Sequence, residues 1–305
     1  MDIYLPIAGL SVNALVIGGL GMLVGVLSGM FGVGGGFLTT PLLIFYGISP
    51  AVAVGSSAAQ VAGTSVSGAI AHSRHGGVDY QMGGIMALGG AFGSLIGGVI
   101  FRLLQKSGQI DTVVAMLYVF FLGGIGILML REAAGALLRG RSGAPAPAVA
   151  PRRHHPLIAA LPLRWRFYRS GLYISPLAPL AIGVGIGILT VLLGVGGGFV
   201  VVPAMIYLLG MSTRVVIGTS LFQTLFTAAA ATMIHSVSTK AVDIVLAVLL
   251  LVGSVVGAQI GARFARQLKP EWLRLALALI VLAVGIRMAL SLGWRPGEIY
   301  TAQPL

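Results

Sequence analysis

The chain has 305 residues, of which 57% are hydrophobic and only 9% are charged, and its formal net charge is +12. Soluble globular proteins carry about 25% charged residues, so this composition excludes a soluble domain and indicates an integral membrane protein. The positive charge does not predict nucleic-acid binding, because the basic residues lie between apolar segments, as in the cytoplasmic loops of membrane proteins.

Cysteine is absent, so the chain has no disulfide and no thiol chemistry. The N-terminus lacks the basic region and the small-residue cleavage site of a signal peptide, so we expect the first apolar segment to remain in the mature protein. No residue between Asp2 and Arg74 is charged. A helix needs about 20 apolar residues to cross the hydrocarbon layer, so this stretch contains several membrane-embedded segments.

The first of these segments is predicted to be interrupted. Residues 10–30 form one helix, Gly32 to Gly36 break it, and residues 37–45 form a short apolar piece. At 1.5 Å per residue this piece is too short to cross a membrane alone, so a broken or re-entrant hairpin is expected. Three full membrane helices follow, at about 51–73, 82–102 and 112–131.

Residues 132–177 differ in composition from the rest of the chain. They contain the run Gly-Ala-Pro-Ala-Pro and many arginines, which predicts a flexible linker on the cytoplasmic side. Trp165 and Tyr168, set among these arginines, indicate contact with the membrane interface. His154 and His155 have no third ligand beside them, so we expect a polar loop and no metal site there.

The remainder of the chain, 178–305, repeats the first part, 1–131. The motif Gly-Val-Gly-Gly-Gly-Phe occurs at 32–37 and again at 194–199. Scarce polar residues then follow in the same order in both copies: Gln60 and Gln223, His72 and His235, Asp79 and Asp243. Apolar sequence of low complexity would not keep such an order, so the chain is a duplication. The helices of the second copy are expected at 178–193, 199–209, 215–235, 244–263 and 272–290.

The predicted fold is an all-α integral membrane protein with two inverted repeats. Each copy holds a hairpin that returns to its starting side and three full crossings, and an odd number of crossings inserts the second copy upside down. Loop charge agrees in part. The linker and the loop at 263–274 both become cytoplasmic, whereas Arg102 and Lys106 fall outside. Glycines at every fourth position predict close helix contacts; they are Gly89, Gly93, Gly97, Gly253, Gly257 and Gly261.

The two glycine breaks are the first candidate binding elements. Glycine lets the backbone approach a ligand closely, and exposed backbone at membrane depth occurs only where it lines a cavity or is buried in protein. Half-helix N-termini beyond such breaks offer N–H groups that suit an oxyanion, and broken helices at matching places are typical of transporter sites. A kink for helix packing is the alternative. The candidate residues are Gly34, Gly35, Gly36, Gly196, Gly197 and Gly198.

The helix after each break carries a stripe of polar side chains. In the first copy, Ser57, Gln60, Thr64 and Ser67 fall within about 80° of one another, with Ser56 at the border. In the second copy, the stripe consists of Ser220, Gln223 and Thr227, with Thr219 beside them. Serine and threonine commonly join helices, but a glutamine amide must be satisfied inside the bilayer. We therefore expect the substrate to contact Gln60 and Gln223 together with Ser56, Ser57, Thr219 and Ser220.

His72 and His235 lie about 18 Å beyond these glutamines along their helices and about 110° from the polar stripe. This position predicts interface anchors near a membrane face. A proton relay is the alternative, because histidine titrates near neutral pH. No Asp or Glu lies within a predicted span, so Asp79 and Asp243 are expected to be helix caps or loop residues, and no metal or cofactor is expected.

The duplicated Gly-Val-Gly-Gly-Gly-Phe motif, followed in each copy by a proline, a Gly-Ser/Thr-Ser triplet and a glutamine, resembles the TauE/SafE sulfite exporter family. The resemblance covers about 20–131 and 178–290 and leaves out the linker. It implies a permease for sulfite, organosulfonates or other small sulfur-containing compounds that works by secondary transport.

Sequence and resemblance together predict a multi-pass transporter of the inner (plasma) membrane. Its site is expected between the two glycine breaks and the two glutamine helices, and its partners are a small anion and the lipid bilayer. A dry site with N–H, hydroxyl and amide donors and no acidic side chain suits a weakly basic oxyanion. An anion channel is the nearest alternative. An enzyme would need a nucleophile–base pair or a metal cluster within the spans, and the sequence contains neither, so no enzymatic activity is expected.

Overall fold

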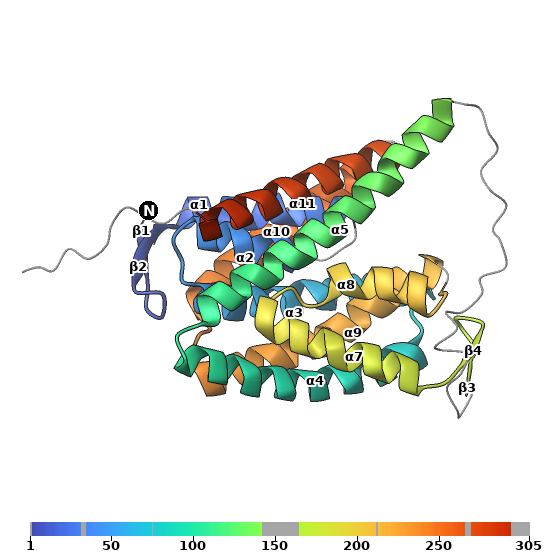
Figure 1. Cartoon of the computed structure of the whole chain (residues 1–305), viewed down its shortest axis with the longest axis horizontal. Coiled ribbons are helices and arrows are strands. Elements are labelled where there is room, and N and C mark those ends of the chain that lie inside the picture. The colour runs from blue at the N-terminus through green and yellow to red at the C-terminus, as the bar shows by residue number, and fades with distance from the viewer. Residues whose placement is uncertain are drawn as a thin grey trace, which may run out of the picture.

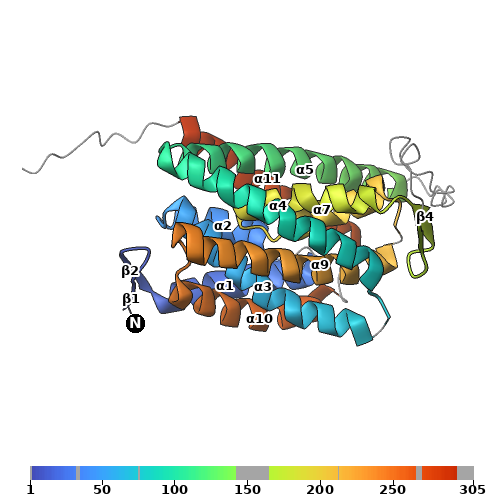
Figure 2. The ribbon, with the colours of Figure 1, turned by 90° about the horizontal axis from the view of Figure 1, so that it is seen from below.

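The structure is a computed structural model that describes residues 2–31, 35–74, 76–141, 165–211, 213–265 and 270–293. Figure 1 and Figure 2 show a bundle of long helices with a short β-hairpin at each end. The elements of the first half are β1 (Asp2–Leu5), β2 (Leu10–Asn13), α1 (Ala14–Phe31), α2 (Gly36–Phe45), α3 (Pro50–Arg74), α4 (Tyr80–Lys106) and α5 (Ile110–Arg141). Those of the second half are β3 (Trp165–Phe167), β4 (Leu172–Ile174), α7 (Leu177–Leu193), α8 (Gly198–Pro203), η1 (Ala204–Leu208), α9 (Thr213–Ile234), η2 (His235–Thr239), α10 (Ile244–Ala265) and α11 (Pro270–Gly293).

The predicted all-α membrane fold is confirmed, with differences at the ends of two helices. Residues 10–13 form strand β2, which pairs antiparallel with β1, so the first helix begins four residues later than predicted. Helix α5 continues to Arg141, because the residues after 131 include the good helix formers Glu, Ala and Leu. The start of the predicted linker is therefore helical. Residues 142–164, its proline-rich part, lie outside the described residues.

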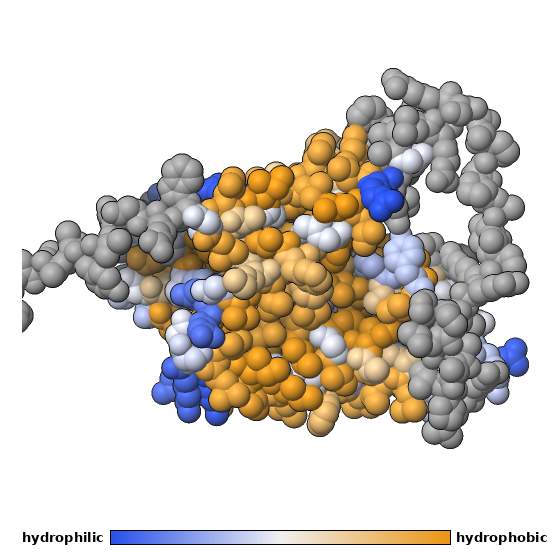
Figure 3. All heavy atoms as spheres, viewed as in Figure 1, coloured by the Kyte–Doolittle hydropathy of each residue, from blue (hydrophilic) through white to orange (hydrophobic). Residues whose placement is uncertain are grey.

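Five of the described helices are long and apolar enough to cross a membrane. They comprise Tyr80–Lys106, Ile110–Arg131, Val215–Thr239, Ile244–Gly261 and Leu275–Gly293. Helix α3 has sufficient length, 25 residues, but it carries the polar stripe. Figure 3 shows a broad apolar band around the middle of the molecule, with hydrophilic side chains gathered at its two ends. This surface fits a bilayer around the middle and water at both ends.

The two halves exchange helices, and matching residues make matching contacts. Helix α1 packs along α10, and its counterpart α7 packs along α4. A Cβ atom on Gly93 would lie 2.0 Å from the carbonyl oxygen of Val184, and one on Gly257 would lie 2.1 Å from that of Met22. The predicted role of the glycine rows in close helix packing is therefore confirmed, since the backbones touch where no side chain intervenes.

Equivalent helices of the two copies run antiparallel where they meet. In the α3–α9 pair, Gly68 near the end of α3 lies against Leu221 near the start of α9, whereas Gly55 near the start of α3 lies against Ala241 beyond the end of η2. The α5–α11 pair follows the same rule. This arrangement is what inverted repeats produce, so it supports the predicted inversion, which stays a prediction for the orientation in a bilayer.

Each glycine break turns the chain back on itself. Gly35 lies against Val24 in the middle of α1, and Leu43 near the end of α2 packs in one cluster with Leu5 and Ile17 at the start of the half. Helix α2 therefore runs back along α1, which supports the predicted broken or re-entrant hairpin. The second half repeats this path, since η1 packs in the same hydrophobic cluster as the β3–β4 hairpin at the start of that half.

Asp79 and Asp243 cap helices, as predicted, and also tie the halves together. Each accepts a hydrogen bond from a backbone N–H in the first turn of the helix that follows, at 3.0 and 3.1 Å. The second carboxylate oxygen of each residue reaches the β-hairpin of the other half. Asp79 accepts from the N–H of Ser170 (3.1 Å) and Asp243 from that of Ile7 (3.0 Å).

We expect the two β-hairpins to lie on opposite sides of the membrane. Because the chain has no cysteine, single replacements at the exposed Tyr4 and Tyr168 can be labelled in intact cells with a membrane-impermeant thiol reagent. Tyr4→Cys should react from outside, and Tyr168→Cys, which adjoins the linker, should react only after the cells are opened. Labelling of both from the same side would refute the inverted topology.

Candidate functional site

The two glycine breaks meet at the centre of the molecule. A Cβ atom on Gly36 would lie 2.9 Å from the carbonyl oxygens of both Gly194 and Val195, so the breaks can touch only because this residue is glycine. The next residues in the two motifs, Phe37 and Phe199, stack with ring centroids 4.7 Å apart and an angle of 5° between the rings. The two copies of the motif thus pair with each other across the boundary between the halves.

The break in the second half also needs glycine for its backbone conformation. Gly194, Gly196 and Gly197 have φ angles of +69°, +67° and +78°, which residues with a Cβ atom rarely adopt. Gly198 is the first residue of α8. Among the predicted glycines of the first break, Gly34 lies outside the described residues.

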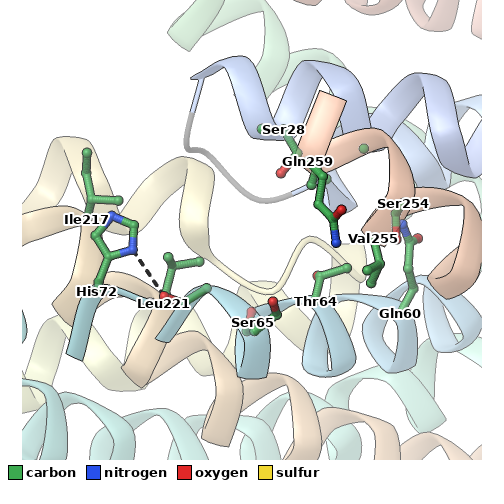
Figure 4. Close-up of a pocket in the computed structure, with 16 residues that line it drawn as sticks. Ser28, Gln60, Thr64, Ser65, His72, Ile217, Leu221, Ser254, Val255 and Gln259 are labelled. Carbon is green, nitrogen blue, oxygen red and sulfur yellow. Dashed lines mark hydrogen bonds between the residues drawn. The ribbon is translucent and has the colours of Figure 1, made fainter. Parts of the chain in front are cut away.

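A cavity of about 330 Å³ lies beside the first break. Helices α1, α3, α9 and α10 and the residue Gly35 form its lining, so both halves contribute. Gln60, Thr64 and Ser67 of the predicted polar stripe lie along the α3 wall. Figure 4 shows Gln60 at one end of the cavity and His72 at the other, about 18 Å apart along α3.

Gln60 is buried, with 1% of its surface exposed, and its Oε1 atom has no hydrogen-bond partner within the described part of the chain. Its Nε2 atom lies beside Gly35, 3.8 Å from the position of a Cβ atom there. A buried polar atom without a partner costs about 1–3 kcal/mol, so this amide is expected to bind a molecule that enters the cavity. By rotating about its last side-chain bond, the amide can offer either its oxygen or its N–H groups.

Four polar residues of the cavity lining were not predicted from the sequence: Ser28 on α1, Ser65 on α3, and Ser254 and Gln259 on α10. In Figure 4, Ser28 and Gln259 face Thr64 and Ser65 across the cavity. Gln259 has a signal in the sequence, because it is a glutamine within an apolar span. Its counterpart in the first copy is Leu95, so a comparison of the two copies does not mark Gln259 as a candidate.

Gln223, the counterpart of Gln60, lies outside the cavity and is enclosed by protein. It is completely buried, and its Nε2 donates to the hydroxyl of Thr227 at 2.7 Å. The hydroxyl of Ser57 is also buried, and neither it nor Oε1 of Gln223 has a partner among the described residues, whereas Ser220 donates to the carbonyl of Ile217 at 2.8 Å. The lining of the cavity includes none of Ser57, Ser220 and Gln223.

Ser56 and Thr219 hold the two halves together. The hydroxyl of Ser56 accepts a hydrogen bond from the N–H of Asp243 at 3.1 Å, and that of Thr219 accepts one from the N–H of Asp79 at 2.9 Å. Thr219 also donates to the carbonyl of Val215 at 2.7 Å. These bonds position the starts of α10 and α4, and neither residue belongs to the lining of the cavity.

The two predicted histidines differ in their surroundings. His72 lines the cavity together with residues of the polar stripe, and its Nδ1 lies 3.1 Å from the carbonyl oxygen of Gly68 in its own helix; its role as an interface anchor stays a prediction. His235 is completely buried. Its Nε2 donates to the carbonyl of Val191 at 2.9 Å, and its Nδ1 lies 3.1 Å from the hydroxyl of Thr239.

The polar side chains that line the cavity are amides and hydroxyls, together with His72. Apart from His72, none of the described residues in the lining is titratable, and no group of three His, Asp or Glu in the described part of the chain could hold a metal ion. Gly35, in the cavity wall, is the N-cap of α2, and no side chain caps this helix. The N-terminal end of α2, which carries the positive end of the helix dipole, therefore lies at the wall of the cavity.

Comparison with known proteins agrees with this arrangement. The model of the family described as sulfite exporter TauE/SafE matches residues 17–288, which span both halves. The chain belongs to the TauE/SafE family. As a member of this family it is a multi-pass transporter of the plasma membrane and not an enzyme.

Relatives of this TauE/SafE protein carry general names. A probable membrane transporter protein of Xylella fastidiosa (strain Temecula1) is 30% identical over 272 residues, covering 88% of this chain and 92% of that protein. The probable membrane transporter protein YjnA of Bacillus subtilis is 29% identical over 272 residues, covering 88% of this chain and 97% of that protein. No solved structure matches the chain significantly.

Proposed function

We propose that this TauE/SafE protein is a secondary permease for small sulfur-containing anions such as sulfite or organosulfonates. The binding site comprises Gln60 and Gly35, beside the paired glycine breaks. The observation that carries the proposal is the buried side chain of Gln60, whose Oε1 has no partner among the described residues, in the wall of a cavity that both halves line. The family description adds the sulfur chemistry.

The charge of the cavity favours an anion with a single negative charge. Among the described residues, the lining contains no carboxylate that would repel an anion and no lysine or arginine that would neutralise a second charge. The cost of removing an ion from water rises with the square of its charge, whereas amide, hydroxyl and backbone N–H donors can support one charge. Hydrogen sulfite and sulfonates are therefore expected to bind better than sulfate.

The size of the cavity leaves room for an organic group. At about 30 Å³ per water molecule, the volume of about 330 Å³ corresponds to roughly ten waters. Hydrogen sulfite would enter with much of its hydration, and an organosulfonate would replace that water with its carbon chain. The apolar part of the lining, which includes Ile217, Leu221 and Val255, suits such a chain.

The structure favours a carrier over an anion channel. A channel needs a continuous path, and the cavity ends at Gln60 and Gly35. Beyond them, the counterpart residues in the second half, such as Gln223, Thr227 and Ala231, are completely buried. Access from one side only is what a carrier requires at any one moment.

Binding and flux measurements on purified protein test the proposal. Isothermal titration should give saturable binding of hydrogen sulfite, sulfoacetate or both, with sulfate at least tenfold weaker, and proteoliposomes should show saturable uptake of the bound anion. Taurine, which adds a positive charge, tests whether a zwitterion is accepted. Single-channel currents in planar bilayers would establish a channel instead, and no binding of any of these compounds would overturn the sulfur-anion assignment.

A further inference from the structure

The cavity and its counterpart in the second half differ in accessibility. Matching the two copies pairs His72 with His235, Thr64 with Thr227 and Gly68 with Ala231. His72, Thr64 and Gly68 line the cavity and are at least partly accessible. Their three counterparts are 0% exposed. The same set of residues is therefore open in the first half and closed in the second.

His235 makes the bond that ties the closed half together. Its Nε2 donates to the carbonyl of Val191 at 2.9 Å, and its ring meets the ring of Phe101 edge-on at 4.7 Å. Val191 lies in the last turn of α7, three residues before the first glycine of the break, where helical carbonyls lack a partner within the helix. The bond joins the end of the α9 helix to the end of α7 and closes the space between them.

The end of α7 has two further supports. The carbonyl of Leu193, the last residue of α7, accepts hydrogen bonds from the hydroxyls of Thr40 and Tyr118, which both belong to the first half. The counterpart of Thr40 in the second copy is Val202, and α11, the counterpart of α5, has only apolar residues from 275 to 285. The end of α7 is thus held by two hydroxyls that the sequence of the second copy does not repeat.

The first half has an equivalent helix-end carbonyl, but His72 bonds within its own helix. The counterpart of Val191 is Gly29, also three residues before the first glycine of its break. Gly29 and His72 both line the cavity. The Nδ1 of His72 contacts the carbonyl of Gly68 in its own helix, one turn away, so α3 is not tied to the end of α1 as α9 is tied to that of α7.

We propose that His235 and His72 act as alternating latches of the transport path. In the observed state the bond from His235 to the carbonyl of Val191 closes the second half, and the cavity of the first half is open. In the opposite state His72 donates to the carbonyl of Gly29 and closes the cavity, while His235 releases Val191. This inference rests on the transporter function and does not depend on which anion is carried.

Labelling of single cysteines tests the latches without a substrate. Ser67→Cys reports on the open cavity and Ala231→Cys on the closed counterpart, in a chain that has no other cysteine. Loss of a hydrogen bond worth about 1 kcal/mol shifts a two-state population about fivefold. His235→Ala should therefore raise the labelling rate of Ala231→Cys about fivefold from the side of the β1–β2 hairpin and lower that of Ser67→Cys from the other side.

Two further variants separate a latch from a structural role. His235→Gln, whose amide can reach the same carbonyl, should restore the parental labelling rates. His72→Ala should lower the labelling of Ala231→Cys about fivefold, because the opposite state loses its latch. Parental labelling of Ala231→Cys in a folded His235→Ala protein would overturn the proposal. If His235→Ala does not fold, parental labelling in His72→Ala overturns it. Absence of sulfite binding alone would overturn the proposed substrate and leave the latches standing.

Discussion

Replacement of Gln60 by leucine is expected to weaken anion binding by roughly tenfold or more while the protein still folds. The substitution removes the donors and the acceptor of the amide at nearly constant volume. A bond from an amide to a charged ligand contributes about 1.5–3 kcal/mol, which corresponds to roughly 10- to 150-fold in the dissociation constant. Since Oε1 of Gln60 is unpaired without ligand, no bond within the protein is lost at that atom. Isothermal titration with the bound anion measures the effect.

Gln223→Leu is the matched control for Gln60→Leu. Sequence alone predicts the same loss for both, because the residues are counterparts in the repeat. In the structure, Gln223 is fully buried, bonded to Thr227 and absent from the cavity lining, so its replacement should leave the affinity within about twofold and lower stability slightly. Bonds between helices in membranes average about 0.6 kcal/mol. Equal anion affinity of Gln60→Leu and the parent would show that Gln60 serves helix packing and does not bind the anion.

Gly93→Ala is expected to cause the largest loss of stability among the glycine-to-alanine substitutions in α4. The new Cβ atom would lie 2.0 Å from the carbonyl oxygen of Val184 and 2.7 Å from its carbonyl carbon, so the backbones of α4 and α7 must separate. Overpacking against movable side chains already costs about 1–3 kcal/mol, and backbone gives way less easily. We expect little folded protein, or a melting temperature in detergent lowered by about 10 °C or more, by fluorescence-detected size exclusion.

Gly84→Ala provides the matched control in the same helix. No heavy atom lies within 4 Å of the position of its Cβ atom, and alanine has the higher helix propensity, by about 1 kcal/mol. This variant should therefore be as stable as the parent or slightly more stable. If Gly93→Ala behaved like Gly84→Ala, the close approach of α4 and α7 would be incorrect, and with it the exchange of helices between the halves.

Most of the fold follows from local features of the sequence. The length of the charge-free stretches predicts the long helices, because a span is limited by the thickness of the bilayer. The glycine runs predict the interruptions, because several adjacent glycines do not sustain a helix. The β-hairpins escape prediction, since strands of three or four residues carry too little pattern. The extension of α5 to Arg141 also escapes it, because alanine-rich and arginine-rich sequence suits both a helix and a loop.

The candidate site was predictable in part. Gly35 and Gln60 stand out because a helix break and a buried amide that recur at matching places in an apolar chain are seldom explained by helix packing alone. Ser56 and Thr219 stand out for the same reason, yet their hydroxyls receive the N–H groups of Asp243 and Asp79. A hydroxyl facing a ligand and one facing the cap of a distant helix look alike in sequence. Whether such a hydroxyl faces a ligand or a helix cap depends on contacts between residues more than 100 positions apart.

The sequence by itself determined that this protein lies in a membrane, that it is a duplication and where each copy is broken, since these properties depend on composition and on short-range order. Only the tertiary structure decided that Gln60 lies beside an open cavity and Gln223 in a closed space. Each glutamine follows a Gly-Ser/Thr-Ser triplet and precedes a threonine by four residues, so local rules assign both the same role. Their difference arises from the packing around them, because Gln223 bonds to Thr227 in a closed space whereas Gln60 lies beside Gly35 and the cavity.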